Sequence, residues 1–377
     1  MEKLNVIIIL IDGGRLDRIM NSNYFQSLKS KFSFFSNLIT YSPHTIAAMH
    51  AIFSGCYGTR TGTNSYWSTY QFKKNQFKTL TEYLKDADYY THADIVNKIV
   101  IPKQGFDEFN VHDEQKDNLT TRHCEILNHL NKHSENKKFF VFLQYSNIHT
   151  GIMNQVLKVY NNFSKEFFDN PSLNKKRYDD LFHDAEVYLE KILEKIHELS
   201  LEKDSIILIM SDHGMSVGEK FGERAYGAFC YDYTLRTFAY FLTPDFPSRS
   251  INQQVRTIDF MPTLLDFLDL DTDSNFEKLD GESLLPLIKG DDLAEKIAYA
   301  ETGNPLQGKE PPKKPNIRCV RLSEWKLILN EHNNTRELYH LVNDPDENEN
   351  LSGTGLEIED RLFEKLETIK NGERLYK

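Results

Sequence analysis

The chain has 377 residues, which is long enough for one large domain with a small appendage and for a sizeable buried core. It carries 56 acidic and 45 basic residues and a formal net charge of −11 at pH 7, which argues against a nucleic-acid polymer or an anionic membrane surface as the main partner. A small anionic ester remains a suitable substrate, because the local field at one site can oppose the net charge.

The cysteines and the N-terminal residues bear on location. The 4 cysteines are scattered and form no CxxC pair, so neither a zinc knuckle nor a disulfide framework is expected. The apolar run at 6–11 is too short for a signal-peptide core or a membrane span. We therefore expect a reduced, cytoplasmic protein with no transmembrane segment, and we leave its oligomeric state open.

Four apolar runs predict strands that are buried on both faces. They are "NVIIILIDGG" (5–14), "KKFFVFLQYSNIHTG" (137–151), "DSIILIMSDHG" (204–214) and "FAYFLTPD" (238–245). Helical patterns lie between them at 79–88, 121–133 and 178–199. This alternation predicts an α/β fold with a doubly wound, mostly parallel sheet and helices on both faces.

The C-terminal part changes character. Segments 317–331 and 335–351 predict short antiparallel strands, and 358–371 predicts a closing helix. A stretch rich in Pro, Gly and Lys at 303–315 predicts a loop. We expect a catalytic domain at 1–298 and a small α+β subdomain at 299–377 that packs on it.

The polar residues that follow the apolar runs are candidate metal ligands. Asp12 ends the first run, and Asp212 and His213 end the third. Ligands of doubly wound sheets gather at the carboxyl ends of strands, and a mixed set of carboxylates and imidazole suits Mn²⁺, Zn²⁺ or Mg²⁺ better than Ca²⁺. Each stretch taken alone is also compatible with a turn or helix-cap Asp and a solvent-facing His.

Thr45 is a candidate nucleophile. It stands directly before "IAAMHAIFSG", a helical pattern of small and apolar residues. A helix N-terminus offers free N–H groups and partial positive charge to a phosphate or sulfate. A threonine hydroxyl becomes an effective nucleophile when a metal or a base activates it. The simpler alternative is that Thr45 only caps this helix.

Ordered motifs along nearly the whole chain resemble the sulfatase and alkaline-phosphatase superfamily. The stretch that ends in "SG" (54–55) is similar to the family's C-x-P-x-R-A-x-L-L-T-G, with Thr45 in the nucleophile column. Further matches are "YGTRTG" (57–62), "QGFDEF" (104–109), "SDHG" (211–214), "VRTIDFMPTLLDFLDL" (255–270), "LDGESLLPLIKG" (279–290), "WKLILN" (325–330) and "ELYHLVNDPDENENL" (337–351). So many matches in order imply the fold.

The chain also departs from the sulfatase pattern in its catalytic devices. Sulfatases convert Cys or Ser to formylglycine, and Thr45 cannot give that aldehyde because its β-carbon carries a methyl group. The Arg column holds Met49, the column of a second Asp holds Gly13, and the K-W-H segment is reduced to Lys98. These departures favour the superfamily branches that use Thr on phosphorus esters.

The resemblance therefore implies a metal-dependent hydrolase of phosphodiesters, phosphomonoesters or phosphonate esters with a covalent phospho-threonine intermediate. One divalent cation (Mn, Zn, Mg or Ca) is expected on Asp12, Thr45, Asp212 and His213, without formylglycine. His149 is expected to act in catalysis, and Arg224 and Lys98 to bind a small anionic ester. The alternatives are a sulfatase that works without formylglycine, a phosphoglycerol or phosphoethanolamine transferase, and an inactive metal-binding relative.

Overall fold

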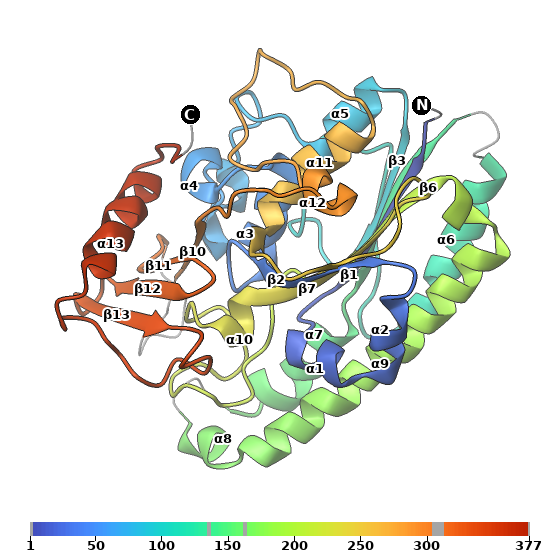
Figure 1. Cartoon of the computed structure of the whole chain (residues 1–377). Helices are drawn as coiled ribbons and strands as arrows, with labels where there is room; N and C mark the ends of the chain where they lie inside the picture. Colours follow the sequence, from blue (N-terminus) through green and yellow to red (C-terminus); the bar gives the residue numbers. More distant parts are fainter. Residues whose placement is uncertain (1–2, 134–136, 161–163, 304–312, 376–377) are drawn as a thin grey trace.

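The computed structural model describes residues 3–133, 137–160, 164–303 and 313–375. A large sheet forms the centre of the molecule (Figure 1). Its strands are β1 (Asn5–Ile11), β2 (Ser33–Ile39), β3 (Tyr90–Ile95), β4 (Glu108–Val111), β5 (Phe139–Tyr145), β6 (Ser205–Met210), β7 (Arg236–Leu242), β8 (Ser250–Ile251) and β9 (Val255–Arg256). They follow the order β4-β3-β5-β1-β6-β7-β2-β8, with β9 also paired to β2. The pairs from β4 to β6 are parallel, and β7 is antiparallel to both of its neighbours.

The central strands of this sheet are the ones that the apolar runs predicted. Every residue of β1, β5 and β6 is buried, so a continuous apolar sequence suits both faces of each strand. In register, Ile8 lies beside Phe142 of β5 on one side and Leu208 of β6 on the other. The predicted doubly wound, mostly parallel α/β sheet is therefore confirmed.

Helices cover both faces of the large sheet (Figure 1). On one face, Val6, Ile8 and Leu10 of β1 pack in a core with α3 (Thr45–Ser54), α5 (Leu80–Asp86), α11 (Phe260–Phe267) and α12 (Leu285–Lys289). On the other face, Ile7, Ile9 and Ile11 pack with α1 (Leu16–Asn21), α2 (Asn23–Leu28), α6 (Leu119–His133), α7 (Asn147–Ile152), α8 (Lys165–Asp169) and α9 (Pro171–Glu198). The remaining short helices are α4 (Gly58–Thr61), η1 (Tyr66–Gln71), the π-turn η2 (Met153–Leu157), η3 (Leu201–Lys203), α10 (Asp232–Leu235) and η4 (Thr257–Asp259).

A smaller antiparallel sheet follows toward the C-terminus, as predicted. It contains β10 (Ala298–Thr302), β11 (Ile317–Arg321), β12 (Trp325–Asn330) and β13 (Thr335–His340), and α13 (Glu357–Lys370) packs on it. Leu362 and Leu366 of α13 share a core with Val320 of β11 and with Ala47 of α3, so this unit rests on the large domain. Most of the predicted loop at 303–315 lies outside the described residues. Among the described helices, none is both long and apolar enough to cross a bilayer.

Candidate active site

Three of the predicted metal ligands converge at the ends of adjacent strands. Asp12 follows β1, and Asp212 and His213 follow its parallel neighbour β6. One ligand atom from each of these side chains lies within 4.8 Å of the other two, and all three side chains are buried. We call this set the strand-tip cluster. The Oγ1 of Thr45 lies 3.4 Å from Asp12 Oδ1 and 3.2 Å from His213 Nε2, so the hydroxyl faces the same point.

Hydrogen bonds orient the strand-tip cluster toward Thr45. The Nδ1 of His213 lies 2.8 Å from the carbonyl oxygen of Gly214, which can only accept, so Nδ1 carries a proton and Nε2 is the ring nitrogen that faces Thr45. The Nε2 of Gln144 donates to Asp12 Oδ2 at 2.7 Å, which leaves Asp12 Oδ1 directed at Thr45. Such outer contacts are typical of residues that hold a metal.

The second carboxylate of the cluster is incompletely partnered. Asp212 Oδ1 accepts a bond from the Gly13 N–H at 3.2 Å, whereas Asp212 Oδ2 is buried and has no hydrogen-bond partner among the described residues. Burial, and then the charge of Asp12, raises the pKa of Asp212. Two buried carboxylates and an imidazole nitrogen that face one point are a donor set that fits a divalent metal.

Gly13, where sulfatases have a second Asp, has a backbone conformation that favours glycine. Its φ is +75°, and a Cβ atom there would lie 2.4 Å from the Met215 side chain. A larger residue is therefore strained by the positive φ and needs the end of the flexible Met215 side chain to move. The departure from the sulfatase pattern at this position is built into the loop that carries Asp12.

Thr45 does not act as a helix cap. It is the first residue of α3, the N-cap position belongs to His44, and no side-chain cap bond forms there. All ten residues of α3 are buried, and the N-terminus of this helix meets the strand-tip cluster, where its partial positive charge favours an anion. The alternative interpretation of Thr45 as only a cap is therefore not supported by the geometry.

A cavity of about 350 Å³ opens beside Thr45. Asp12, Thr45 and His149 line it, so the two residues predicted to be catalytic share one space. Its other walls are Ile46, Val96, Asn97, Ile99, Val100, His112, Asp113 and Glu114. The Tyr226 ring stacks on His213, with the centroids 4.8 Å apart, and lies 5.8 Å from the His149 ring.

The family model of the sulfatases matches residues 5–270, and the model of the N-sulphoglucosamine sulphohydrolase C-terminal region matches residues 226–372. The first match covers well over half of the chain. The chain belongs to the sulfatase family. The expected resemblance to the sulfatase and alkaline-phosphatase superfamily is thereby confirmed. A comparison with curated protein sequences finds no match.

Solved structures similar to this sulfatase-family chain include a sulfatase and a phosphonate monoester hydrolase. A protein in complex with its substrate D-glucosamine-2-N,6-O-disulfate is 17% identical, with 98% of each chain covered and a TM-score of 0.76. A 2-O GAG sulfatase is 17% identical, with 98% of this chain and 93% of the other covered and a TM-score of 0.77. The phosphonate monoester hydrolase of Agrobacterium radiobacter is 13% identical, with 98% and 96% covered and a TM-score of 0.75. These likenesses show the fold and leave the substrate class open.

Neither of the two predicted substrate-binding cations is among the described residues that line the cavity. Lys98 is exposed, between the cavity residues Asn97 and Ile99, and is not itself a wall of the cavity. The Arg224 guanidinium donates to the Leu157 carbonyl oxygen at 2.7 Å, in the π-turn that follows α7. The roles of Lys98 and Arg224 toward substrate stay predictions.

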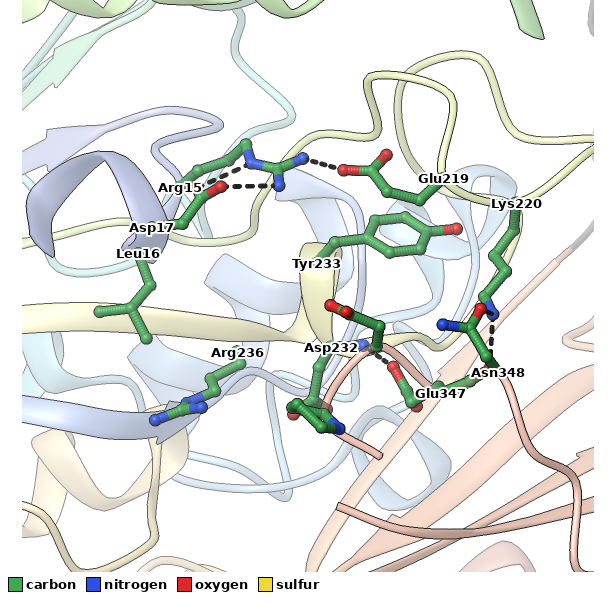
Figure 2. Close-up of a pocket in the computed structure, with 12 residues that line it drawn as sticks. Arg15, Leu16, Asp17, Glu219, Lys220, Asp232, Tyr233, Arg236, Glu347 and Asn348 are labelled. Atoms are coloured by element: carbon green, nitrogen blue, oxygen red, sulfur yellow. Dashed lines mark hydrogen bonds and ion pairs between the residues drawn. The ribbon is translucent and has the colours of Figure 1, made fainter. Parts of the chain in front are cut away.

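A charged pocket of about 450 Å³ is lined by residues of α10 and of the segments that follow β1, β6 and β13, and Figure 2 shows its walls. Arg15 forms ion pairs there with Asp17 and Glu219. Lys220 donates to Asn348 at 3.1 Å, and the Asp232 N–H donates to Glu347 at 2.6 Å. The last two contacts join the segment after His213 to the segment that follows β13.

A second buried cluster of histidines and a carboxylate lies further along the sheet. It consists of Asp94 in β3, His112 after β4 and His123 in α6, and we call it the β3 cluster. His112 Nδ1 lies 2.7 Å from Asp94 Oδ1, and His112 Nε2 lies 2.9 Å from Ser146 Oγ. The β3 cluster thus connects the ends of three neighbouring strands and reaches the cavity through His112.

Several residues of the site carried no signal that the motifs identified. Gln144 is the one amide in the apolar run of β5, and it is the residue that contacts Asp12. A polar residue that interrupts a buried strand near its carboxyl end is a usable signal, because it needs a partner. His112 and Glu114 follow β4, a short and partly exposed strand with no long apolar run.

Proposed function

We propose that this sulfatase-family chain is a metal-dependent hydrolase of phosphorus esters that uses Thr45 as its nucleophile. The observation that carries the proposal is the Thr45 hydroxyl, which lies 3.2 Å from His213 Nε2 and 3.4 Å from Asp12 Oδ1 in the column where sulfatases carry formylglycine. An alkoxide suits attack on phosphorus, and a threonine at this position cannot be converted to the formylglycine aldehyde that sulfatases use. One structural neighbour is a phosphonate monoester hydrolase, which is compatible with this substrate class.

Asp12, Asp212 and His213, together with the Thr45 hydroxyl, are the residues that would hold one divalent cation. When bound, the cation supplies charge that lowers the pKa of a hydroxyl and offsets the charge of the transferred phosphoryl group. The donor set of carboxylates, imidazole and hydroxyl admits Mn²⁺, Zn²⁺, Mg²⁺ or Ca²⁺.

The residues of the cavity account for each proton. Asp12 Oδ1, which lies 3.4 Å from Thr45 Oγ1, takes the Thr45 proton. Oγ1 forms a bond to phosphorus, and the ester P–O bond breaks while His149 gives a proton to the leaving oxygen. The product is phospho-Thr45 and a free alcohol. Water then attacks phosphorus, neutral His149 takes a proton from that water, the P–O bond to Thr45 breaks, and Asp12 returns its proton to Thr45 Oγ1.

A second candidate function is hydrolysis of sulfate esters without formylglycine. The family match and the sulfatases among the structural neighbours favour it. Transfer of the phosphoryl group to an acceptor alcohol instead of water is a further variant of the first proposal. An inactive metal-binding relative is the remaining alternative, and it predicts bound metal without turnover of any ester.

Matched aryl esters separate these functions. The metal-loaded protein is assayed with 4-nitrophenyl phosphate, bis-4-nitrophenyl phosphate, a 4-nitrophenyl phosphonate and 4-nitrophenyl sulfate, which share one leaving group. We expect kcat/KM for the best phosphorus ester to exceed that for the sulfate by at least about tenfold, or roughly 1.4 kcal/mol in transition-state free energy. Equal or faster turnover of the sulfate would contradict the proposed substrate class.

We also propose a cytoplasmic location. Cys56, Cys124, Cys230 and Cys319 are all free, and three of them are buried. Free thiols are typical of proteins in reducing compartments.

A further inference from the structure

Glu114 is a carboxylate of the cavity that the mechanism above does not use. It lies three residues beyond β4, and both Glu114 and His149 line the cavity that contains Thr45. Its Oε2 accepts a hydrogen bond from Thr150 Oγ1 at 2.9 Å and lies 3.8 Å from His149 Nδ1. The carboxylate therefore faces one ring nitrogen of His149 at a distance slightly longer than a hydrogen bond.

Glu114 and His149 are held in place by the same two segments. His112, two residues before Glu114, contacts Ser146 Oγ, and Ser146 is the residue directly before α7, which carries His149. Thr150, directly after His149, donates to Glu114. The segment after β4 and the start of α7 are thus joined by two hydrogen bonds, which fix the position of the carboxylate relative to the ring.

The charges around His149 distinguish Glu114 from its neighbours. Burial lowers the pKa of His149, but Glu114 and then the charges of Asp12 and Asp212 more than offset this, so the pKa is raised. The Tyr226 ring lies 5.8 Å from the His149 ring. Asp12 and Asp212 belong to the candidate metal site, where a cation would cancel their charge. Glu114 is outside that set and keeps its effect.

We propose that Glu114 is a positioning residue for His149, and this inference rests on the role given to His149 in the proposed function. The carboxylate faces Nδ1–H of the ring, so that Nε2–H is the group left to donate to the leaving oxygen. It also keeps the ring protonated until that oxygen departs, when the Nε2 proton moves to the alcohol and leaves a neutral imidazole. The Asp–His pair of serine hydrolases shows the general effect of such a carboxylate.

The leaving group provides the test. Wild-type protein, Glu114→Gln and the control Glu125→Gln, an exposed carboxylate on α6, are assayed with an alkyl ester and a 4-nitrophenyl ester of the same phosphorus acid. An alkoxide needs a proton and 4-nitrophenolate does not. We expect Glu114→Gln to lower kcat/KM about tenfold or more for the alkyl ester and less than about threefold for the nitrophenyl ester. An equal loss on both esters would identify a merely structural role and overturn the inference.

The pH dependence provides a second readout that does not need turnover. Glu114→Gln should move the His149 titration, followed by ¹⁵N NMR of the metal-loaded protein and assigned with His149→Asn, to lower pH by about one unit. Glu125→Gln should leave that titration in place. An unchanged His149 titration in Glu114→Gln would overturn the inference. If Thr45→Ala keeps full activity, the proposed function fails while this titration still decides the pairing.

Discussion

The strand-tip cluster and the β3 cluster have nearly the same composition, lie at the same end of the large sheet and are both buried. They differ in how their polar atoms are partnered. In the β3 cluster, Asp94 Oδ1 faces His112 and Asp94 Oδ2 accepts from Arg122 at 2.7 Å. In the strand-tip cluster, Asp212 Oδ2 has no hydrogen-bond partner among the described residues.

The same difference appears at the histidines. The outer nitrogens of the β3 cluster contact hydroxyls, His112 Nε2 at Ser146 and His123 Nδ1 at Tyr188. In the strand-tip cluster, His213 Nε2 faces Thr45 and two carboxylates. Proximity of ligand atoms alone therefore does not identify a metal site. A cluster whose carboxylate is already paired with an arginine and histidines is accounted for as a structural network, whereas one with a carboxylate oxygen that lacks a hydrogen bond is the better fit for a cation.

The pKa values of the two aspartates move in opposite directions. Burial raises the pKa of both, and the charge of Asp12 raises that of Asp212 further. At Asp94 the hydrogen bonds from His112 and His123, together with Arg122, outweigh burial and hold the pKa below its ordinary value. Substitutions at matched positions test this difference. The hydroxyl of Thr45 is compared with that of Ser146, and the carboxylate of Asp212 with that of Asp94.

The largest expected difference concerns the hydroxyls. Thr45→Ala should lower kcat by at least about three orders of magnitude while unfolding at nearly the wild-type urea concentration, because it removes the nucleophile and no core packing. Thr45→Ser should keep part of the activity, since the hydroxyl remains and loses only the methyl that restricts its rotamer. Intact mass with a slow substrate should reveal a phosphoryl adduct on wild-type protein that Thr45→Ala lacks.

Ser146→Ala is the matched control in the β3 cluster. It removes the partner of His112 Nε2 and should cost about 1–3 kcal/mol of stability, with a much smaller effect on kcat than Thr45→Ala. If Thr45→Ala retained near-normal turnover on the best substrate, the proposed nucleophile would be wrong.

The second largest expected difference is the metal content of variants at the two carboxylates, Asp212 and Asp94. After purification with Mn²⁺ or Zn²⁺ in excess, elemental analysis should find about one metal per wild-type chain, and far less in Asp212→Asn. Asp94→Asn should keep the metal, because Asp94 is already paired with Arg122. Loss of metal from Asp94→Asn, with none lost from Asp212→Asn, would reverse the assignment of the two clusters.

These contrasts also show which parts the sequence could predict. The strands β1, β5 and β6 were predictable because both of their faces are buried, and a strand tip then places Asp12, Asp212 and His213 at one edge. The fold and its antiparallel C-terminal sheet follow the same logic. The outer strands β3 and β4 were not predicted, because their segments lack a long apolar run.

The missed strands explain the missed residues. His112 and Glu114 follow β4, so without that strand nothing placed them beside α7 and His149. The orientation of Thr45 is also a tertiary fact: sequence could not distinguish a helix cap from a hydroxyl directed at Asp12, because both begin a helix. The family motifs identified Thr45 as the candidate nucleophile. Only the packing of α3 against two strand ends shows that its hydroxyl faces Asp12 and His213.

The smallest expected effect is the pH dependence of the β3 cluster. Asp94→Asn leaves Arg122 and the two histidines without their buried carboxylate, so it should lower the free energy of unfolding by about 3–5 kcal/mol at pH 7. Because the folded-state pKa of Asp94 lies below its unfolded value, its contribution is fully present above about pH 4 and declines as the pH falls below that value. Urea unfolding of both proteins should therefore show a penalty roughly 1 kcal/mol smaller at pH 3 than at pH 7.

The exposed pair of Lys176 and Asp180 gives the control, since Asp180→Asn should cost less than about 0.5 kcal/mol at either pH. A penalty for Asp94→Asn that grew toward acid pH would mean that Asp94 is protonated in the folded protein, and the β3 cluster would then be an uncompensated site like its neighbour.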